Sequence, residues 1–154
     1  MANTSYQELF DLFMQQVEDY RLLELYNGGV GESNLTTYLI GFMNLAIPEF
    51  EPCTQNLQDK DDGAKTFNFE MTMENKKLLS KFMVKEWLGK ELKDILQMRW
   101  NITDQGSFKH FSEAQNTKSK SEVFEQLRED CSQALMSYSL KHNDWDAWSI
   151  GKFI

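Results

Sequence analysis

The sequence predicts an all-α fold: a helical bundle of about four helices with an extended central arm and an extended C-terminal tail. Three observations support this prediction. Only two prolines and eight glycines interrupt 154 residues, which favours long helices over a turn-rich sheet. Apolar residues recur at spacings of three and four along most of the chain. A content of 41% apolar and 26% charged residues is ordinary for one globular domain with a buried core.

The first helix is predicted from Ser5 to Tyr26, because its apolar residues fall on a single stripe. Thr4 or Ser5 is a suitable N-cap, and Glu8 lies three residues after Ser5, as a capping box requires. A glycine-rich run at 28–31 then ends the helix, since glycine readily adopts the left-handed conformation of C-terminal caps. No Gly-Lys-Ser/Thr follows the run, so it does not match a phosphate-binding loop.

The second helix is predicted from Asn34 to about Glu49, with Ser33 as its N-cap. Pro48 lies near the end of this helix, and Pro52 closes it, because the residue before a proline disfavours helical geometry.

A polar, exposed loop is predicted from Cys53 to Lys65. Its acidic residues around Gly63 are similar in composition to a calcium-binding loop. An EF-hand with Gly63 at position 6 would have Gln58 at position 1, Lys60 at position 3 and Phe69 at position 12. These residues do not supply the required ligands, so the loop is predicted to be solvated rather than a metal site.

The segment Thr66–Met71 alternates apolar and polar residues, which predicts a short strand or an extended segment with Phe67, Phe69 and Met71 facing inward. A strand alone cannot form a sheet. We therefore expect either an extended arm packed on its own chain or an edge that pairs with a neighbouring subunit. In the second case Phe67 and Phe69 are partner-binding residues.

The third helix is predicted to begin at Thr72 and to continue to Trp100, with a bend near Gly89. A connector is predicted over residues 101–115. The last long helix is then predicted from Lys118 to His142, with Thr117 or Ser119 as its N-cap.

The last twelve residues form an acidic tail that is rich in large apolar groups. Burial of one such side chain is worth roughly 1.5–3 kcal/mol, so we expect the tail to dock. It either covers the end of its own bundle or binds a groove on another subunit or protein. The chain therefore divides into a helical domain (1–142, with the loop and arm at 53–71) and a C-terminal docking tail (143–154). The predicted partner-binding residues of the tail are Trp145, Trp148, Ile150, Phe153 and Ile154.

No catalytic or metal-binding signature stands out. His110 and His142 have no serine, cysteine or paired carboxylate at a catalytic spacing. Cys53 and Cys131 are far apart and outside any CxxC pattern, which favours two reduced thiols. We therefore expect a protein that is not an enzyme, with no catalytic residue, no metal and no cofactor.

The formal charge of −8 argues against a nucleic-acid-binding surface and against an anionic membrane as partner. The first residues lack a basic segment followed by an apolar run, and no stretch approaches 18 apolar residues. We therefore expect synthesis in a cytoplasm and no membrane partner.

One pattern combines the predicted helical pair at 11–26 and 35–50 with a set of later residues: Trp87-Leu88, Leu92, Leu96, Thr103-Asp104, Phe108-Lys109, Phe111-Ser112 and Ala114. This pattern resembles the head–tail connector (adaptor or head-completion) proteins of tailed bacteriophages. The resemblance covers residues 5 to about 142, is one of pattern, and supplies no catalytic residues.

The resemblance implies a structural virion protein in the phage neck, at the head–tail interface. Such subunits form a ring, commonly of about twelve copies, that joins the portal to the tail and lines the DNA channel. The implied partners are further copies of the chain, the portal protein, tail or other neck proteins, and DNA that passes without specific binding. An acidic lumen fits this role, because it repels phosphates. The alternative is an acidic phage-encoded protein that inhibits a host nucleic-acid enzyme by mimicry.

Overall fold

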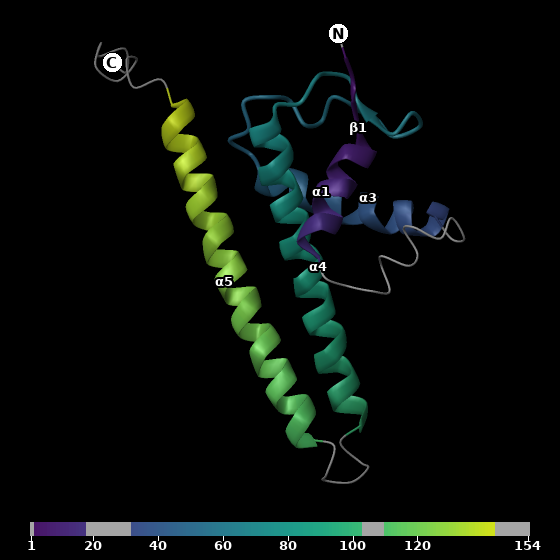
Figure 1. Cartoon of the computed structure of the whole chain (residues 1–154), viewed down its shortest axis with the longest axis vertical. Coiled ribbons are helices and arrows are strands. Elements are labelled where there is room, and N and C mark those ends of the chain that lie inside the picture. Colours follow the sequence, from purple (N-terminus) through teal and green to yellow (C-terminus); the bar gives the residue numbers. More distant parts are fainter. Residues whose placement is uncertain (1, 18–31, 103–109, 144–154) are drawn as a thin grey trace.

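The computed structural model describes the backbone of residues 2–17, 32–102 and 110–143, and the side chains of residues 2–17, 35–96 and 117–143 (Figure 1). The predicted all-α class is confirmed: within these residues there are four helices, and the β structure is limited to three two-residue strands. The helices are α1 (Tyr6–Gln16), α3 (Glu32–Glu49), α4 (Met73–Ile102) and α5 (His110–His142), and the strands are β1 (Thr4–Ser5), β2 (Lys60–Asp61) and β3 (Thr66–Phe67).

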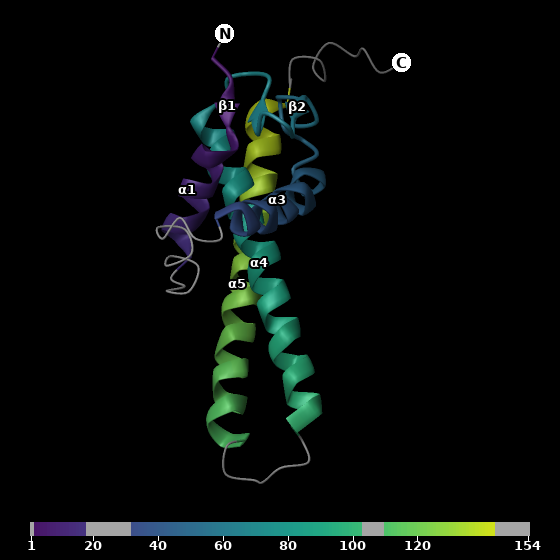
Figure 2. The same ribbon diagram turned by 90° about the vertical axis from the view of Figure 1, so that its right-hand side faces the viewer.

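Helix α4 is the central element of the fold. Helices α1, α3 and α5 all pack against it. Figures 1 and 2 show that α1 and α3 lie beside the N-terminal half of α4, whereas α5 runs antiparallel to α4 along most of its length. The distal half of this α4–α5 hairpin extends beyond the other described elements (Figure 2).

The hydrophobic core lies where α1, α3, the sheet and the N-terminal half of α4 meet. Helix α5 contributes only two fully buried apolar side chains among its described residues, Cys131 and Tyr138. Burial of this many large apolar groups is the main favourable term in folding. The core side chains with no exposed surface are Leu9, Phe13, Leu39, Met43, Ala46, Phe67, Leu79 and Met83.

Helix α1 begins as predicted and ends earlier than predicted. The capping box is confirmed: the amide of Gln7 donates to Ser5 Oγ at 3.1 Å, and the amide of Ser5 donates to Glu8 Oε1 at 3.3 Å. The helix ends at Gln16, where we had predicted Tyr26, because Val17 is extended. Val17 is nevertheless only 3% exposed, so its side chain reaches the core without continuing the helix. Residues 18–26 of the predicted helix lie outside the described residues.

Helix α3 begins at Glu32, two residues before the predicted start, so Ser33 lies inside the helix and is not its N-cap. The helix ends at Glu49, as predicted, with Pro48 in its last turn. A turn follows, in which the amide of Phe50 donates to the carbonyl of Ile47 at 3.1 Å.

The predicted arm is the centre of a small antiparallel sheet with strand order β1-β3-β2. Thr4 pairs with Phe67 on one side of β3, and Lys60 pairs with Phe67 on the other. Both edges of β3 are therefore occupied by strands of its own chain. The segment is neither an unpaired arm nor an edge strand, and β3 itself has no edge for a neighbouring subunit. Phe67 is fully buried against Tyr6, with ring centroids 5.2 Å apart, and Phe69 is partly buried beside it.

The α4–α5 hairpin differs from the prediction at the start of α5. Helix α4 continues through Gly89 to Ile102; a Cβ at Gly89 would lie 3.1 Å from Phe124 Cε2, so this glycine permits close approach of α5. Helix α5 begins at His110, eight residues before Lys118, so Thr117 lies within the helix instead of capping it. The predicted ending at His142 is confirmed.

Candidate functional site

The five tail residues predicted to bind a partner, Trp145, Trp148, Ile150, Phe153 and Ile154, lie outside the described residues. The structure does place the point from which the tail starts. The end of α5 lies beside the first turn of α4, because Lys141 Nζ contacts Glu74 Oε1 at 2.8 Å and His142 Nε2 lies 3.4 Å from Glu74 Oε2. The other two predicted residues, Phe67 and Phe69, belong to the core and its edge.

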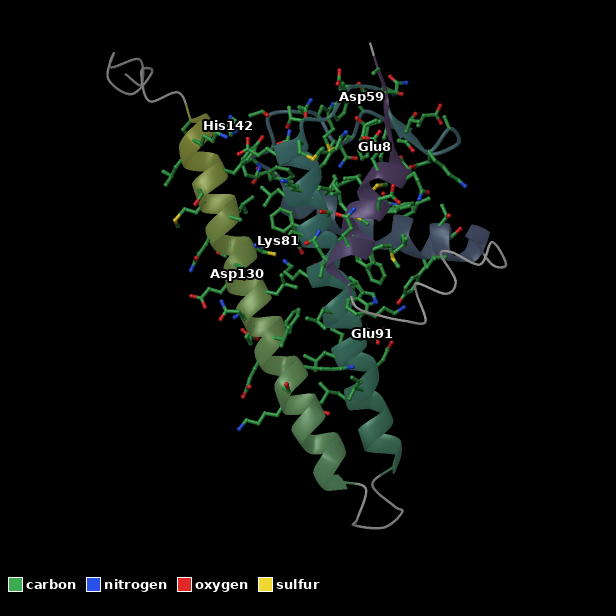
Figure 3. All side chains as sticks on the ribbon, in the orientation of Figure 1. Glu8, Asp59, Lys81, Glu91, Asp130 and His142 are labelled. Atoms are coloured by element: carbon green, nitrogen blue, oxygen red, sulfur yellow. The ribbon has the colours of Figure 1, made fainter. Side chains whose placement is uncertain are left out.

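A groove of about 360 Å³ lies between the first turns of α4 and the last turns of α5, in the region between the labels Lys81 and His142 in Figure 3. We call it the hairpin groove. Its surface is largely apolar, and charged side chains stand around it. It is lined by Glu74, Lys77, Leu78 and Lys81 of α4 and by Ala134, Ser137, Tyr138 and Lys141 of α5.

Tyr138 fixes the floor of the hairpin groove. Its ring is 3% exposed and packs edge-on against Phe50, with centroids 4.9 Å apart. Its hydroxyl accepts a hydrogen bond from the amide of Thr54 at 3.0 Å. These contacts join α5 to the loop after α3, so the groove lies on a packed and hydrogen-bonded support.

The charges around the hairpin groove are unevenly paired. Lys141 donates to both carboxylate oxygens of Glu74, and this hydrogen bonding is the main reason that the pKa of Glu74 lies below its usual value. Lys77 and Lys81 have no ion pair among the residues that the structure describes. In a chain of net charge −8, the apolar floor of the groove is therefore bordered by two lysines that form no ion pair within the described part of the chain.

A second cluster joins α3 to α4. Glu49, the last residue of α3, forms an ion pair with Lys85 of α4 and also bonds to the carboxyl group of Glu86. This hydrogen bond, together with partial burial, raises the pKa of Glu86 to about 7. Glu86 is therefore mostly protonated below about pH 7 and ionised above it.

The distal half of the α4–α5 hairpin is thinly packed. Beyond Val84 on α4, the described residues up to Leu96 include no fully buried side chain, and residues 118–130 of α5 include none either. Leu96 is 40% exposed and Val123 is 57% exposed. This half of the hairpin thus has apolar side chains that the described residues leave partly exposed.

The reactive groups of the described residues serve structural contacts. Burial raises the pKa of both free thiols, Cys53 and Cys131, which disfavours the nucleophilic thiolate. In the polar loop, Asp61 Oδ1 accepts from the amide of Gly63 at 2.8 Å, and Asp62 Oδ1 accepts from the hydroxyl of Tyr6 at 2.7 Å. Among the described residues no cluster of three His, Cys, Asp or Glu side chains has the arrangement of a metal site.

The sequence did not indicate the hairpin groove or the Glu49–Glu86 pair. Each combines residues separated by more than 35 positions, and neither set has a characteristic spacing. The one available signal for the groove was the lysine spacing of four at Lys77 and Lys81, which places two cations on one face of a helix.

Comparison of the chain with models of known families, with curated protein sequences and with solved structures yields no match. No helix in the described parts of the chain is both long enough and apolar enough to cross a bilayer. Functional inference for this protein therefore starts from its exposed surfaces.

Proposed function

We propose that this chain is a non-enzymatic assembly protein, a ring-forming subunit of the neck of a tailed bacteriophage. In this role, copies of the chain join the portal to the tail and line the channel through which DNA passes. The proposal combines the family resemblance of residues 5–142 with one structural observation, the thinly packed distal half of the α4–α5 hairpin.

A helical hairpin that projects from a folded body has a single packed seam. The distal seam of α4 and α5 contains large apolar groups that stay partly exposed, among them Leu92 and Phe124. Two helices alone bury little apolar surface between them, so the hairpin adds little to the free energy of folding. Two further helices packed against it, one on each side, would bury the surface that is left exposed. Neighbouring copies in a ring would supply those helices.

The charge of the chain suits a ring around DNA. Each copy contributes a formal charge of −8, so a ring multiplies the negative charge around its lumen. Such a field repels phosphate groups, and DNA can slide without being held. The other partners in this proposal are the portal protein at one end and tail or further neck proteins at the other.

The proposal is tested by placing charge on the distal hairpin. Leu96→Glu with Val123→Glu changes two exposed side chains, so the fold should keep its stability within about 0.5 kcal/mol per site. Leu45→Glu is the control, because Leu45 is similarly exposed, at 56%, but belongs to α3. Native mass spectrometry of each chain should show loss of the assembled species for the hairpin variant only. Equal assembly of all three chains would contradict the proposal.

A further inference from the structure

We infer that the hairpin groove is the docking site for the segment Asp144–Trp148 of the same chain. The tail would fold back after α5, place a tryptophan on the apolar floor of the groove and direct its aspartates toward Lys77 and Lys81. This inference concerns the isolated chain and does not depend on the formation of a ring.

Charge complementarity is the first argument. Lys77 and Lys81 line the hairpin groove and have no ion pair among the described residues, and the segment carries Asp144 and Asp146. The remaining charged lining residues, Glu74 and Lys141, already neutralise each other. An acidic segment therefore meets net positive charge in the groove, although the chain as a whole is strongly negative.

The dimensions of the groove also fit. A volume of about 360 Å³ is at the small end of ligand pockets and accommodates an indole ring. The apolar floor of Leu78, Ala134 and Tyr138 suits the ring, and the surrounding charges suit the polar groups of the adjacent backbone. Tryptophan is the residue most often found as the anchor of such contacts.

The tail is attached at the right place to reach the groove. Ala134 lies eight residues before His142 on α5, or about 12 Å along the helix axis. An extended chain advances about 3.3 Å per residue, so Trp148 can lie up to about 17 Å from Asn143. When the chain reverses its direction once after α5, this distance is enough to reach any part of the groove. Trp145 can reach only the nearer end, at Tyr138 and Lys141.

Attachment also favours the groove of the same chain over that of a second copy. A short linker gives the tethered segment an effective concentration in the millimolar range. At micromolar protein concentration, a segment of another copy competes at a disadvantage of roughly a hundredfold or more. The isolated chain should therefore occupy its own groove.

The test uses the full chain labelled with 5-fluorotryptophan, which gives one fluorine resonance for each of its four tryptophans. Trp145→Phe and Trp148→Phe assign the two tail resonances. A soluble gadolinium chelate then broadens each resonance according to its exposure to solvent. The chelate should broaden the Trp148 resonance several-fold less in the folded chain than in the chain unfolded in urea. This protection should be the same at protein concentrations of about 10 and about 200 µM.

Charge reversal provides the specific readout. Lys77→Glu with Lys81→Glu should weaken docking about tenfold, because the proposed contacts of these two residues with Asp144 and Asp146 become repulsive. Trp148 should then become more accessible to the chelate. Adding Asp144→Lys and Asp146→Lys to that variant should restore the protection. The matched control is Lys118→Glu with Lys120→Glu, the same change of charge at the far end of α5, which should have no effect.

Three results would overturn the inference. The first is a Trp148 resonance that is as exposed in the folded chain as in urea. The second is protection that grows with protein concentration, which would place the segment on another copy. The third is an equal loss of protection in the control variant. A chain that stays monomeric at all concentrations would count against the ring and leave these readouts unaffected.

Discussion

Replacement of Glu86 by Gln should remove a pH dependence of stability that the Glu49–Glu86 contact creates between α3 and α4. At low pH the protonated carboxyl group of Glu86 bonds to Glu49, and an amide can do the same. At higher pH Glu86 is ionised, and two carboxylates then face each other. The wild-type chain should therefore lose stability as pH rises, and the Glu86→Gln chain should not.

The direction of the effect follows from the raised pKa of Glu86. Its folded-state pKa is about 7, against an ordinary value of 4.5, so the folded chain holds this proton more tightly than the unfolded chain does. The stability that this contributes is complete below about pH 4.5 and is lost as pH rises through about 7. The nearby ammonium groups of Lys85 and Lys93 oppose the effect without reversing it.

The magnitude has an upper limit set by the pKa itself. One pKa unit corresponds to about 1.4 kcal/mol, so the full effect of a shift from 4.5 to about 7 would be about 3.5 kcal/mol. Glu86 is only partly buried, and solvent screening reduces the expected difference to about 1–2 kcal/mol.

Urea unfolding at several pH values from about 5 to about 8 measures this difference. The two chains should be equally stable at about pH 5, and the Glu86→Gln chain should be more stable by about 1–2 kcal/mol at about pH 8. Glu8, Asp62 and Glu74 have lowered pKa values, but they are the same in both chains and cancel in the difference between them. Glu91→Gln, which removes one charge further along α4, is the control and should keep the wild-type pH dependence. Parallel pH profiles for wild type and Glu86→Gln would refute the reasoning.

Three further substitutions test the packing by urea unfolding. Phe67→Ala should cost about 3–5 kcal/mol, because the side chain is fully buried, and Phe69→Ala should cost clearly less; similar costs would contradict the assignment of Phe67 to the core of its own chain. Ser5→Ala should cost about 1 kcal/mol through loss of the capping box, and an unchanged midpoint would count against that role. Tyr138→Phe should cost about 1 kcal/mol by removing the acceptor of the Thr54 amide, with no change in the denaturant slope; a neutral result would mean that this bond adds nothing to stability.

The helices were predictable where local signals coincide, and less so at their ends. The capping box at Ser5 and the start of α4 after Thr72 rest on contacts within four residues; the amide of Asn75 does donate to Thr72 Oγ1, at 3.3 Å. The end of α1 and the start of α5 were misplaced. Candidate caps such as Thr117 occur in several positions of a polar segment, and tertiary packing against α4 decides which of them is used.

The sheet and the two clusters were beyond local prediction. Strand β3 finds its partner Thr4 more than sixty residues away, and two-residue strands have no periodicity to recognise. The Glu49–Glu86 pair and the hairpin groove likewise arise only when α3 and α5 pack on α4. Composition and spacing therefore predicted the class of fold and the inward side chains of the arm, whereas the surfaces proposed to function depend on the arrangement of the helices.

Electron microscopy of the purified full chain, alone and with the portal protein, tests the assembly proposal most directly. We expect closed rings of one fixed symmetry, with the α4–α5 hairpins of adjacent copies packed side by side and Leu96 and Val123 in the contacts between them. Single copies under both conditions, or rings in which the distal hairpin faces solvent on all sides, would contradict the proposal.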